Sequence, residues 1–152
     1  MKHLIILALF ASFAVHATSV CVDVPSVNVR AAPKTKARIL WTAPKYSPFV
    51  YLRQQGGWVQ VSDMDGQEGW VTIQSITQKY RCASIKSNLT MVYQEPNPAK
   101  ADKNYLRLDK YWPLKRLDRK DNWYKVEDLA RNVFWVREDD VWLPIKEVSL
   151  EL

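Results

Sequence analysis

Five aromatic side chains are the residues of this sequence best suited to binding another molecule. They are Tyr46, Trp58, Tyr111, Trp112 and Trp123. The spacing from Tyr46 to Trp58 recurs from Tyr111 to Trp123, so the two pairs occupy equivalent places in the sequence. Rigid amphipathic rings suit the recognition of peptides or sugars. Burial of the same rings in a core is the alternative, because an indole removes a large apolar area from water.

A second candidate surface is basic. Four cationic residues lie close together in the sequence: Arg30, Lys34, Lys36 and Arg38. The stretch 18–62 contains six lysines and arginines but a single carboxylate, Asp23. Such a surface would attract the anionic polymers of a cell wall or an outer membrane. The alternative is an ordinary solvated face, because exposed charges are screened by salt.

Acid–base or metal chemistry has little support in this sequence. The dense carboxylates lie at 63–65 and 138–140, and neither group has the spacing of a calcium loop or of a glycosidase pair. The histidines, His3 and His16, both lie in a segment that we expect to be removed. Without histidine, imidazole-activated nucleophiles and histidine-bound metals are excluded. We therefore expect a protein that is not an enzyme and that uses neither a metal nor another cofactor.

The segment 1–17 has the features of a secretory signal peptide. A positive start precedes an almost unbroken apolar run, and the residues at Val15 and Ala17 suit a signal peptidase. We expect cleavage after Ala17 and a periplasmic or secreted protein without stable membrane insertion. A retained anchor is the alternative, but the apolar run is short for a bilayer span. Losing Lys2 lowers the net charge from +6 to +5, and we expect no nucleic-acid binding from a secreted chain of this modest charge.

The sequence repeats itself at one constant offset. Segments 45–49, 58–61 and 70–71 return 65 residues later as 110–114, 123–126 and 135–136. Because one offset relates three separate motifs without a gap, we interpret the chain as two copies of one small module. We expect a first domain at 18–78 and a second at 79–152. The connection 77–81 is short and lacks glycine and proline, so the two domains should pack together.

Two cysteines, Cys21 and Cys82, each precede the first strand motif of one copy. An even number of cysteines in an oxidising compartment usually pairs, so we expect a disulfide that ties the starts of the two modules together. Lipid attachment at Cys21 is one alternative, although Val20 stands where a small residue would be expected. Two buried free thiols are the other alternative.

Short strands fit the sequence better than helices. Runs rich in β-branched and aromatic residues lie at 27–30, 49–52, 58–61 and 114–117, separated by turn residues. In the third run we place Val59 on the wetter face. We expect the second copy to be about five residues longer before Lys110, in a polar loop at 95–104. Because Arg131 replaces Gly66, we also expect the last hairpin of the second copy to turn differently.

Three motifs of the first copy form a set: Asn28-Val29-Arg30-Ala31-Ala32-Pro33, Gly57-Trp58-Val59-Gln60-Val61 and Gly69-Trp70-Val71. This set resembles the pattern of the bacterial SH3-like domain, often written SH3b, except that Ala32 stands where the family commonly has glycine. The second copy keeps Asn88, Pro96, Trp123 and Trp135-Val136. It lacks the arginine and both glycines before the tryptophans. With a leading cysteine in each copy, the chain is similar to secreted tandem SH3-like proteins of Gram-negative bacteria.

The resemblance implies an all-β fold of two tandem small SH3-like barrels. It also implies a binding function, because members of this family usually bind peptides or cell-wall polymers. We expect a binding module without an attached hydrolase domain, and a ligand that is a peptidoglycan peptide or glycan, or a peptide of an envelope protein. The alternative is a rigid scaffold for an envelope complex. The family's groove borders the segments of Tyr46 and Tyr111, so we expect these tyrosines to be exposed near Trp58 and Trp123.

Overall fold

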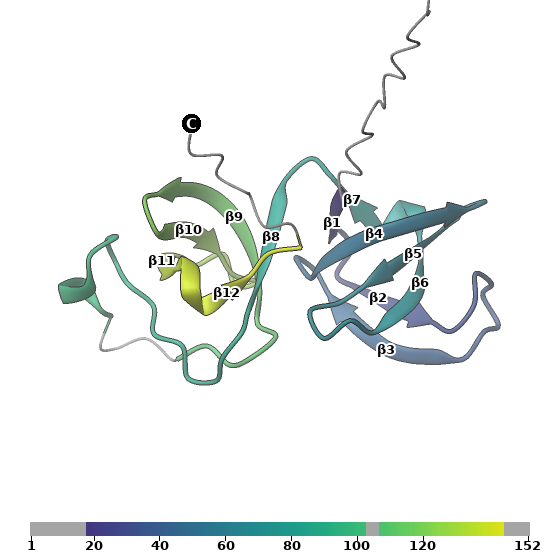
Figure 1. Cartoon of the computed structure of the whole chain (residues 1–152), viewed down its shortest axis with the longest axis horizontal. Helices are drawn as coiled ribbons and strands as arrows, with labels where there is room; N and C mark the ends of the chain where they lie inside the picture. Colours follow the sequence, from purple (N-terminus) through teal and green to yellow (C-terminus); the bar gives the residue numbers. More distant parts are fainter. Residues whose placement is uncertain (1–17, 103–106, 145–152) are drawn as a thin grey trace, which may run out of the picture.

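The computed structural model describes residues 18–102 and 107–144 (Figure 1). In this part of the chain the regular elements are β-strands and three short 3₁₀ helices: η1 (Ile73–Ser75), η2 (Pro98–Lys100) and η3 (Glu138–Asp140). None of these helices is long and apolar enough to cross a membrane. The all-β prediction is confirmed. The expected signal peptide, 1–17, lies outside the described residues and stays a prediction.

The strands form two antiparallel sheets, one from each half of the chain. The first sheet has seven strands in the order β3-β2-β6-β5-β4-β1-β7. They are β1 (Thr18–Val22), β2 (Ser26–Arg30), β3 (Ile39–Pro44), β4 (Pro48–Gln55), β5 (Trp58–Ser62), β6 (Glu68–Thr72) and β7 (Ile76–Thr77). The second sheet has five strands in the order β11-β10-β9-β8-β12. They are β8 (Arg81–Ile85), β9 (Pro113–Lys120), β10 (Trp123–Glu127), β11 (Val133–Arg137) and β12 (Val141–Trp142).

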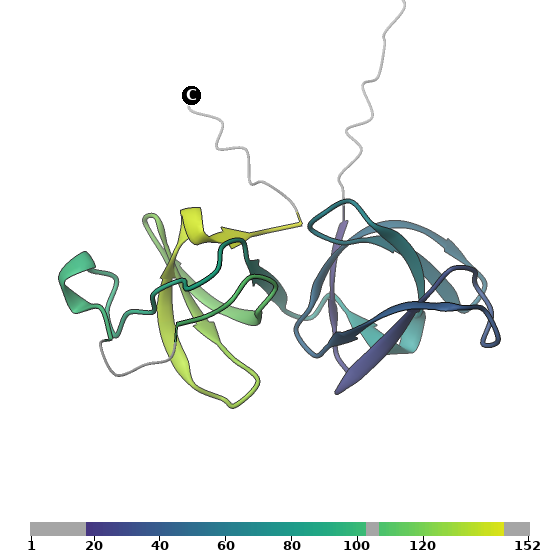
Figure 2. The same cartoon turned by 90° about the horizontal axis from the view of Figure 1, so that it is seen from below.

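We call each sheet with its loops the first unit and the second unit. The two units lie side by side (Figure 1), and Figure 2 shows the strands of the first unit curving around a common interior. Strands β4 to β7 and β9 to β12 begin 65 residues apart, as at Pro48 and Pro113. The pairing is the same in both units, since Val59 lies opposite Val71 and Tyr124 lies opposite Val136. The predicted repeat is confirmed.

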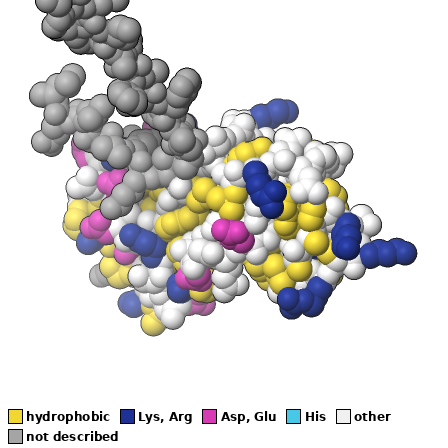
Figure 3. All heavy atoms as spheres, turned by 45° about the vertical axis from the view of Figure 1, so that its right-hand side comes forward, with side chains coloured by type: hydrophobic (Ala, Val, Ile, Leu, Met, Phe, Trp, Pro, Cys, Tyr) yellow, Lys and Arg dark blue, Asp and Glu magenta, His cyan; other side chains and the backbone are white. Residues whose placement is uncertain are grey.

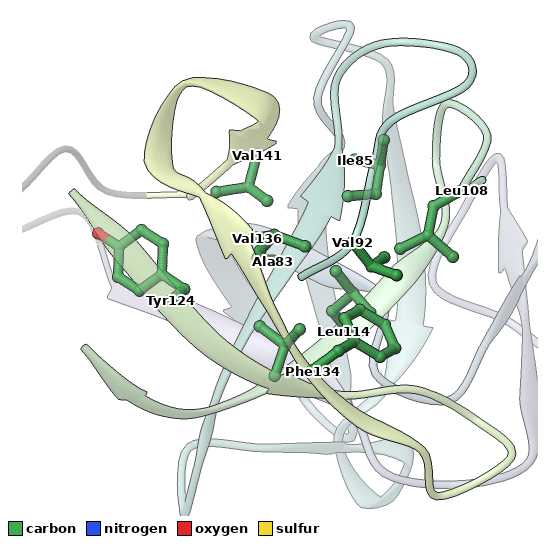
Figure 4. Close-up of a cluster of buried hydrophobic side chains, with 10 residues drawn as sticks. Ala83, Ile85, Val92, Leu108, Leu114, Tyr124, Phe134, Val136 and Val141 are labelled. Atoms are coloured by element: carbon green, nitrogen blue, oxygen red, sulfur yellow. The ribbon is translucent and has the colours of Figure 1, made fainter. Parts of the chain in front are cut away.

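Each unit has its own hydrophobic core on the inner face of its sheet. The core of the first unit consists of Val20, Val22, Val27, Val29, Ala43, Phe49, Val59, Val61 and Val71. Figure 4 shows the core of the second unit, which includes the ring of Tyr124. In β5, Val59 and Val61 are fully buried whereas Trp58 and Gln60 are half-buried. The expectation that Val59 faces water was wrong, because β5 lies between β4 and β6 and its valines cover the inner face.

The insertion in the second unit is shorter than the sequence suggested. Thr90 pairs with Leu108 in the same way that Val27 pairs with Ala43. The offset is therefore 63 residues for the first strand of this pair (27 to 90) and 65 for the second (43 to 108). The difference is two residues, so the predicted insertion of five was wrong.

The same offset changes the counterpart of Asn88. It corresponds to Pro25 and not to Asn28, with which the sequence motif had matched it. The carbonyl of Pro25 accepts the N–H of Lys45 at 3.0 Å. The side-chain oxygen of Asn88 accepts the N–H of Lys110 at 3.2 Å. A side chain in the second unit thus replaces a backbone acceptor in the first.

The last hairpin turns in the same way in both units. Gly66 and Arg131 both have a left-handed backbone, with φ of 79° and 69°. Each donates its N–H to the carbonyl of an aspartate, Asp63 or Asp128. The carboxylates of these aspartates also accept backbone N–H groups of their own turns. The expected difference was wrong, because the aspartate holds the turn and offsets the cost of a left-handed Arg131.

Close packing requires the glycine at Gly69. A Cβ atom at this position would collide with Cγ1 of Val29, a fully buried residue whose branched side chain has few alternative rotamers. The equivalent residue of the second unit is Phe134, which belongs to the core of that unit (Figure 4). The first unit closes its core here with Val29 and Leu40, and the second unit does so with an aromatic ring.

Candidate binding surface

A disulfide between Cys21 of β1 and Cys82 of β8 joins the two units. Both cysteines are buried, and the bond leaves no free thiol in either residue. The predicted disulfide is confirmed. The two cysteines are not equivalent, because Cys21 lies opposite Pro48 and Cys82 lies opposite Lys115, two positions beyond the counterpart of Pro48.

Two equivalent tyrosines cross between the units in opposite directions. The hydroxyl of Tyr46 donates to Glu127 of the second unit at 3.0 Å. The hydroxyl of Tyr111 donates to Asp65 of the first unit at 2.5 Å, and Lys110 forms an ion pair with the same carboxylate at 3.6 Å. Both tyrosines have a left-handed backbone, with φ of 67° and 69°. The junction therefore has an approximate two-fold relation, in which each unit receives the other's tyrosine.

The two tyrosines differ in burial. Tyr46 is 4% exposed and packs edge-on against Tyr80 with ring centroids 5.7 Å apart, so the prediction that Tyr46 is exposed was wrong. Burial raises the pKa of the Tyr46 phenol, and the hydrogen bond to Glu127 raises it further. The hydroxyl consequently stays protonated as a donor. Tyr111 is 53% exposed, as predicted, and its neighbour Trp112 is 38% exposed.

The repeated tryptophans lie at different depths. Trp70 is 5% exposed, whereas Trp58, Trp123 and Trp135 are half-buried. Trp123 packs edge-on against Tyr93 with ring centroids 4.7 Å apart, and the guanidinium of Arg137 lies 5.6 Å from the Trp123 ring. Roles of Trp58, Trp112 and Trp123 in binding a ligand stay predictions.

An arginine–tryptophan row crosses the outer face of the first sheet. Arg30 of β2 pairs with Trp70 of β6, Trp70 pairs with Gln60 of β5, and Gln60 pairs with Arg53 of β4. Residues paired in this way point to the same face of a sheet. The guanidinium of Arg53 lies 4.8 Å from the centroid of the indole and donates to Gln60 at 2.6 Å. Gln60 in turn donates to Glu68 at 2.9 Å.

The loop 31–38 continues this row at the end of the first unit. Arg30 donates to the carbonyl of Ala37 at 2.8 Å and so closes the loop. Lys34, Lys36 and Arg38 are exposed on the loop. In the part of the chain that the structure describes, none of these three cations forms an ion pair. We call the set Arg30, Lys34, Lys36, Arg38 and Arg53 the basic end.

The charge of the two units differs at this place. In the second unit the row consists of Tyr93, Trp135, Lys125 and Asp118, which carry no net charge. Figure 3 shows lysines and arginines along the right-hand side of the molecule, whereas the left-hand side mixes both signs. The sequence had pointed to four of the five cations. Arg53 was missed, because only the strand register places it beside Arg30.

The dense carboxylates have structural roles. Asp63 accepts N–H groups of Asp65 and Gln67 within its turn, as the sequence predicted. Glu138 accepts from Arg119 and from the hydroxyl of Tyr124, each at 3.1 Å. Among the described residues no group of histidine, cysteine or carboxylate side chains could hold a metal ion.

Residues 25–75 match the model of a known family, the bacterial SH3 domain. This match confirms the resemblance of the first copy. No curated protein matches the chain.

Several solved structures share features with the chain at low identity. One is an NlpC/P60 family protein from Bacillus cereus ATCC 10987, at 13% identity and a TM-score of 0.39, over 82% of this chain and 56% of that one. Two others are NlpC2 and NlpC1 from Trichomonas vaginalis. NlpC2 has 13% identity and a TM-score of 0.35, over 84% and 48% of the chains. NlpC1 has 10% identity and a TM-score of 0.34, over 90% and 50%. The chain thus spans about half the length of these structures.

Proposed function

We propose that this chain, whose residues 25–75 form a bacterial SH3 domain, is an exported, non-catalytic protein that binds an anionic polymer of the cell wall. The basic end is the observation that carries the proposal. Five cations from a loop and two strands are gathered beside Trp70, and three of them are exposed without a partner among the described residues. The ligand would be a peptidoglycan peptide or glycan that carries carboxylates.

The arrangement suits a ligand with many weak anionic groups. Each exposed cation contributes little alone, because water and salt screen it. Several cations on one rigid surface can engage successive carboxylates of a polymer, and arginine forks bind carboxylates in a bidentate way. The half-buried guanidiniums of Arg30 and Arg53 are already oriented by Ala37 and Gln60, which lowers the cost of ordering them.

Removing the exposed cations tests the proposal. The variant Lys34→Gln, Lys36→Gln, Arg38→Gln is expected to co-sediment with purified murein about tenfold more weakly than the natural chain, since each charge contributes up to about 1 kcal/mol. The loss should shrink as salt is raised. The measurement is the bound fraction across a titration of murein.

A matched control removes equal charge elsewhere. Lys100→Gln, Arg107→Gln, Lys120→Gln alters three exposed cations of the second unit and should leave sedimentation almost unchanged. Equal weakening by both triple variants would mean that net charge, and not this surface, determines the affinity. Unchanged binding by the loop variant would refute the assignment of the basic end.

Export is the second part of the proposal. The disulfide supports an oxidising compartment, periplasmic or extracellular. The mature chain would comprise a first domain at 18–78 and a second at 79–152. Protein recovered from the native envelope is expected to have an intact mass that begins at Thr18. A mass that retains 1–17, or that includes acyl chains, would contradict this step.

A rigid envelope scaffold is the second candidate function. It is favoured by the junction, where a disulfide and two reciprocal tyrosine hydrogen bonds join the units. The exposed rings of Tyr111 and Trp112 would then contact a peptide of the partner protein. A scaffold would co-purify with one envelope protein and would not sediment with murein, which separates it from wall binding.

A further inference from the structure

A groove of about 770 Å³ opens in the first unit beside β1 and β7. Six of its ten lining residues lie outside the segment 25–75 that matches the SH3 family: Thr18, Val20, Ile76, Thr77, Gln78 and Lys79. The groove is therefore built largely by the strands that this chain adds to the matched domain. None of the residues of the basic end lines it.

The lining combines an aliphatic floor with amide and hydroxyl groups. Val20, Val59 and Ile76 form apolar surface, and Gln54, Thr77 and Gln78 provide donors and acceptors. Lys79, which is exposed, is the one charged residue among the ten lining residues. A ligand of small apolar side chains, backbone-like amides and a negative charge would match each of these groups.

The equivalent groove of the second unit has the opposite charge. It has a volume of about 620 Å³ and is lined by Tyr124, Glu138 and Trp142 where the first has Val59, Ile73 and Thr77. The acidic residues Glu138 and Asp139 lie in its lining. A carboxylate would be repelled there, and larger rings take up the space. The repeat thus provides an internal comparison, in which one groove suits an anion and the other does not.

The walls of the first groove are held in place. Strand β1 pairs with β7 through Cys21 opposite Thr77, and Cys21 is tied to Cys82 by the disulfide. Sugars are commonly bound against aromatic faces, but Tyr51 is the one aromatic residue among the lining residues. An aliphatic floor suits peptide side chains better.

From these contacts we infer that the groove binds a short peptide with small apolar side chains and a free carboxylate, which pairs with Lys79. This site is separate from the basic end and does not depend on the proposed wall polymer. The amide groups of Gln54 and Gln78 and the hydroxyl of Thr77 would bond the peptide backbone.

The test uses the full mature chain labelled with ¹⁵N and two probes, N-acetyl-Ala-Ala-Ala as the free acid and as the carboxamide. The free acid is expected to shift the backbone resonances of Gln54, Thr77 and Gln78, and the carboxamide to bind about tenfold more weakly. Lys79→Gln should reduce binding of the acid to the level of the carboxamide. Because Lys79 is exposed, this variant should keep the fold.

A second variant blocks the groove with a residue taken from the repeat. Thr77→Trp introduces the residue found at Trp142 and should abolish the shifts, whereas Trp142→Thr should leave them unchanged. Equal binding of acid and carboxamide would overturn the role of Lys79. Absence of shifts at several millimolar probe, or shifts confined to Lys34, Lys36 and Arg38, would overturn the groove. Normal binding by a folded Thr77→Trp variant would do the same.

Discussion

Replacing Tyr46 with alanine is expected to lower the free energy of unfolding by about 3–5 kcal/mol, as deletion of a large buried aromatic side chain does. The ring is 4% exposed, packs against Tyr80 and lies beside the disulfide. Its hydroxyl donates to Glu127, whose side chain is 12% exposed. The alanine variant would leave a cavity between the units and remove this hydrogen bond. Urea unfolding of the variant and the natural chain measures the difference.

Two conservative variants separate the ring from the hydroxyl. Tyr46→Phe keeps the ring and is expected to cost about 1–3 kcal/mol, because the largely buried carboxylate of Glu127 loses a donor. Tyr111→Phe removes the equivalent hydroxyl at a residue that is 53% exposed, and should cost less than about 1 kcal/mol. A Tyr46→Ala variant of normal stability with weakened ligand capture would contradict the packing role and restore the aromatic groove hypothesis.

Local sequence patterns were sufficient to predict the strands. The runs 27–30, 49–52, 58–61 and 114–117 all lie within observed strands, because β-branched and aromatic residues bounded by turns select extended backbone. The constant offset of 65 predicted the equivalence of the later strands. These properties depend on neighbours in sequence, which is why composition and spacing report them.

Contacts between the two units could not be predicted in this way. Tyr46 and Tyr111 have the same neighbours in sequence and the same backbone conformation, yet one is 4% and the other 53% exposed. The difference comes from Tyr80 and the disulfide, which cover Tyr46 alone. Burial at a junction depends on how two folded surfaces meet, and a repeat in sequence does not specify that.

Register also lies beyond the sequence pattern. Arg30 and Arg53 are far apart in the chain but lie in one row, because Trp70 and Gln60 pair between them. A shift of one residue in any of these pairings would place Arg53 on the other face. In the last hairpin, Arg131 adopts a backbone that the sequence assigned to glycine, because Asp128 supplies the hydrogen bonds of the turn.

Removing the disulfide is expected to lower the free energy of unfolding by about 4 kcal/mol in the chain-entropy model, because the bond closes a loop across a sequence separation of 61 residues. The variant Cys21→Ala, Cys82→Ala avoids free thiols and is compared with reduced natural protein. Each sheet should still form, since β1 pairs with β4 and β8 pairs with β9 without the bond. Urea unfolding measures the loss, and thiol titration of unfolded, unreduced protein should find no free thiol.

The two units should also become less cooperative when the bond is absent. In the natural chain the bond keeps Tyr46 and Tyr111 close to their acceptors in the opposite unit, so unfolding of one unit exposes the junction of the other. In the double variant the junction depends on these hydrogen bonds and on packing around Tyr80 alone, and two unfolding transitions are expected. A single transition with a loss below about 1 kcal/mol would mean that the junction, and not the bond, couples the units. Combining the double variant with Tyr46→Phe distinguishes these cases, because a cooperative junction would then lose its remaining buried donor.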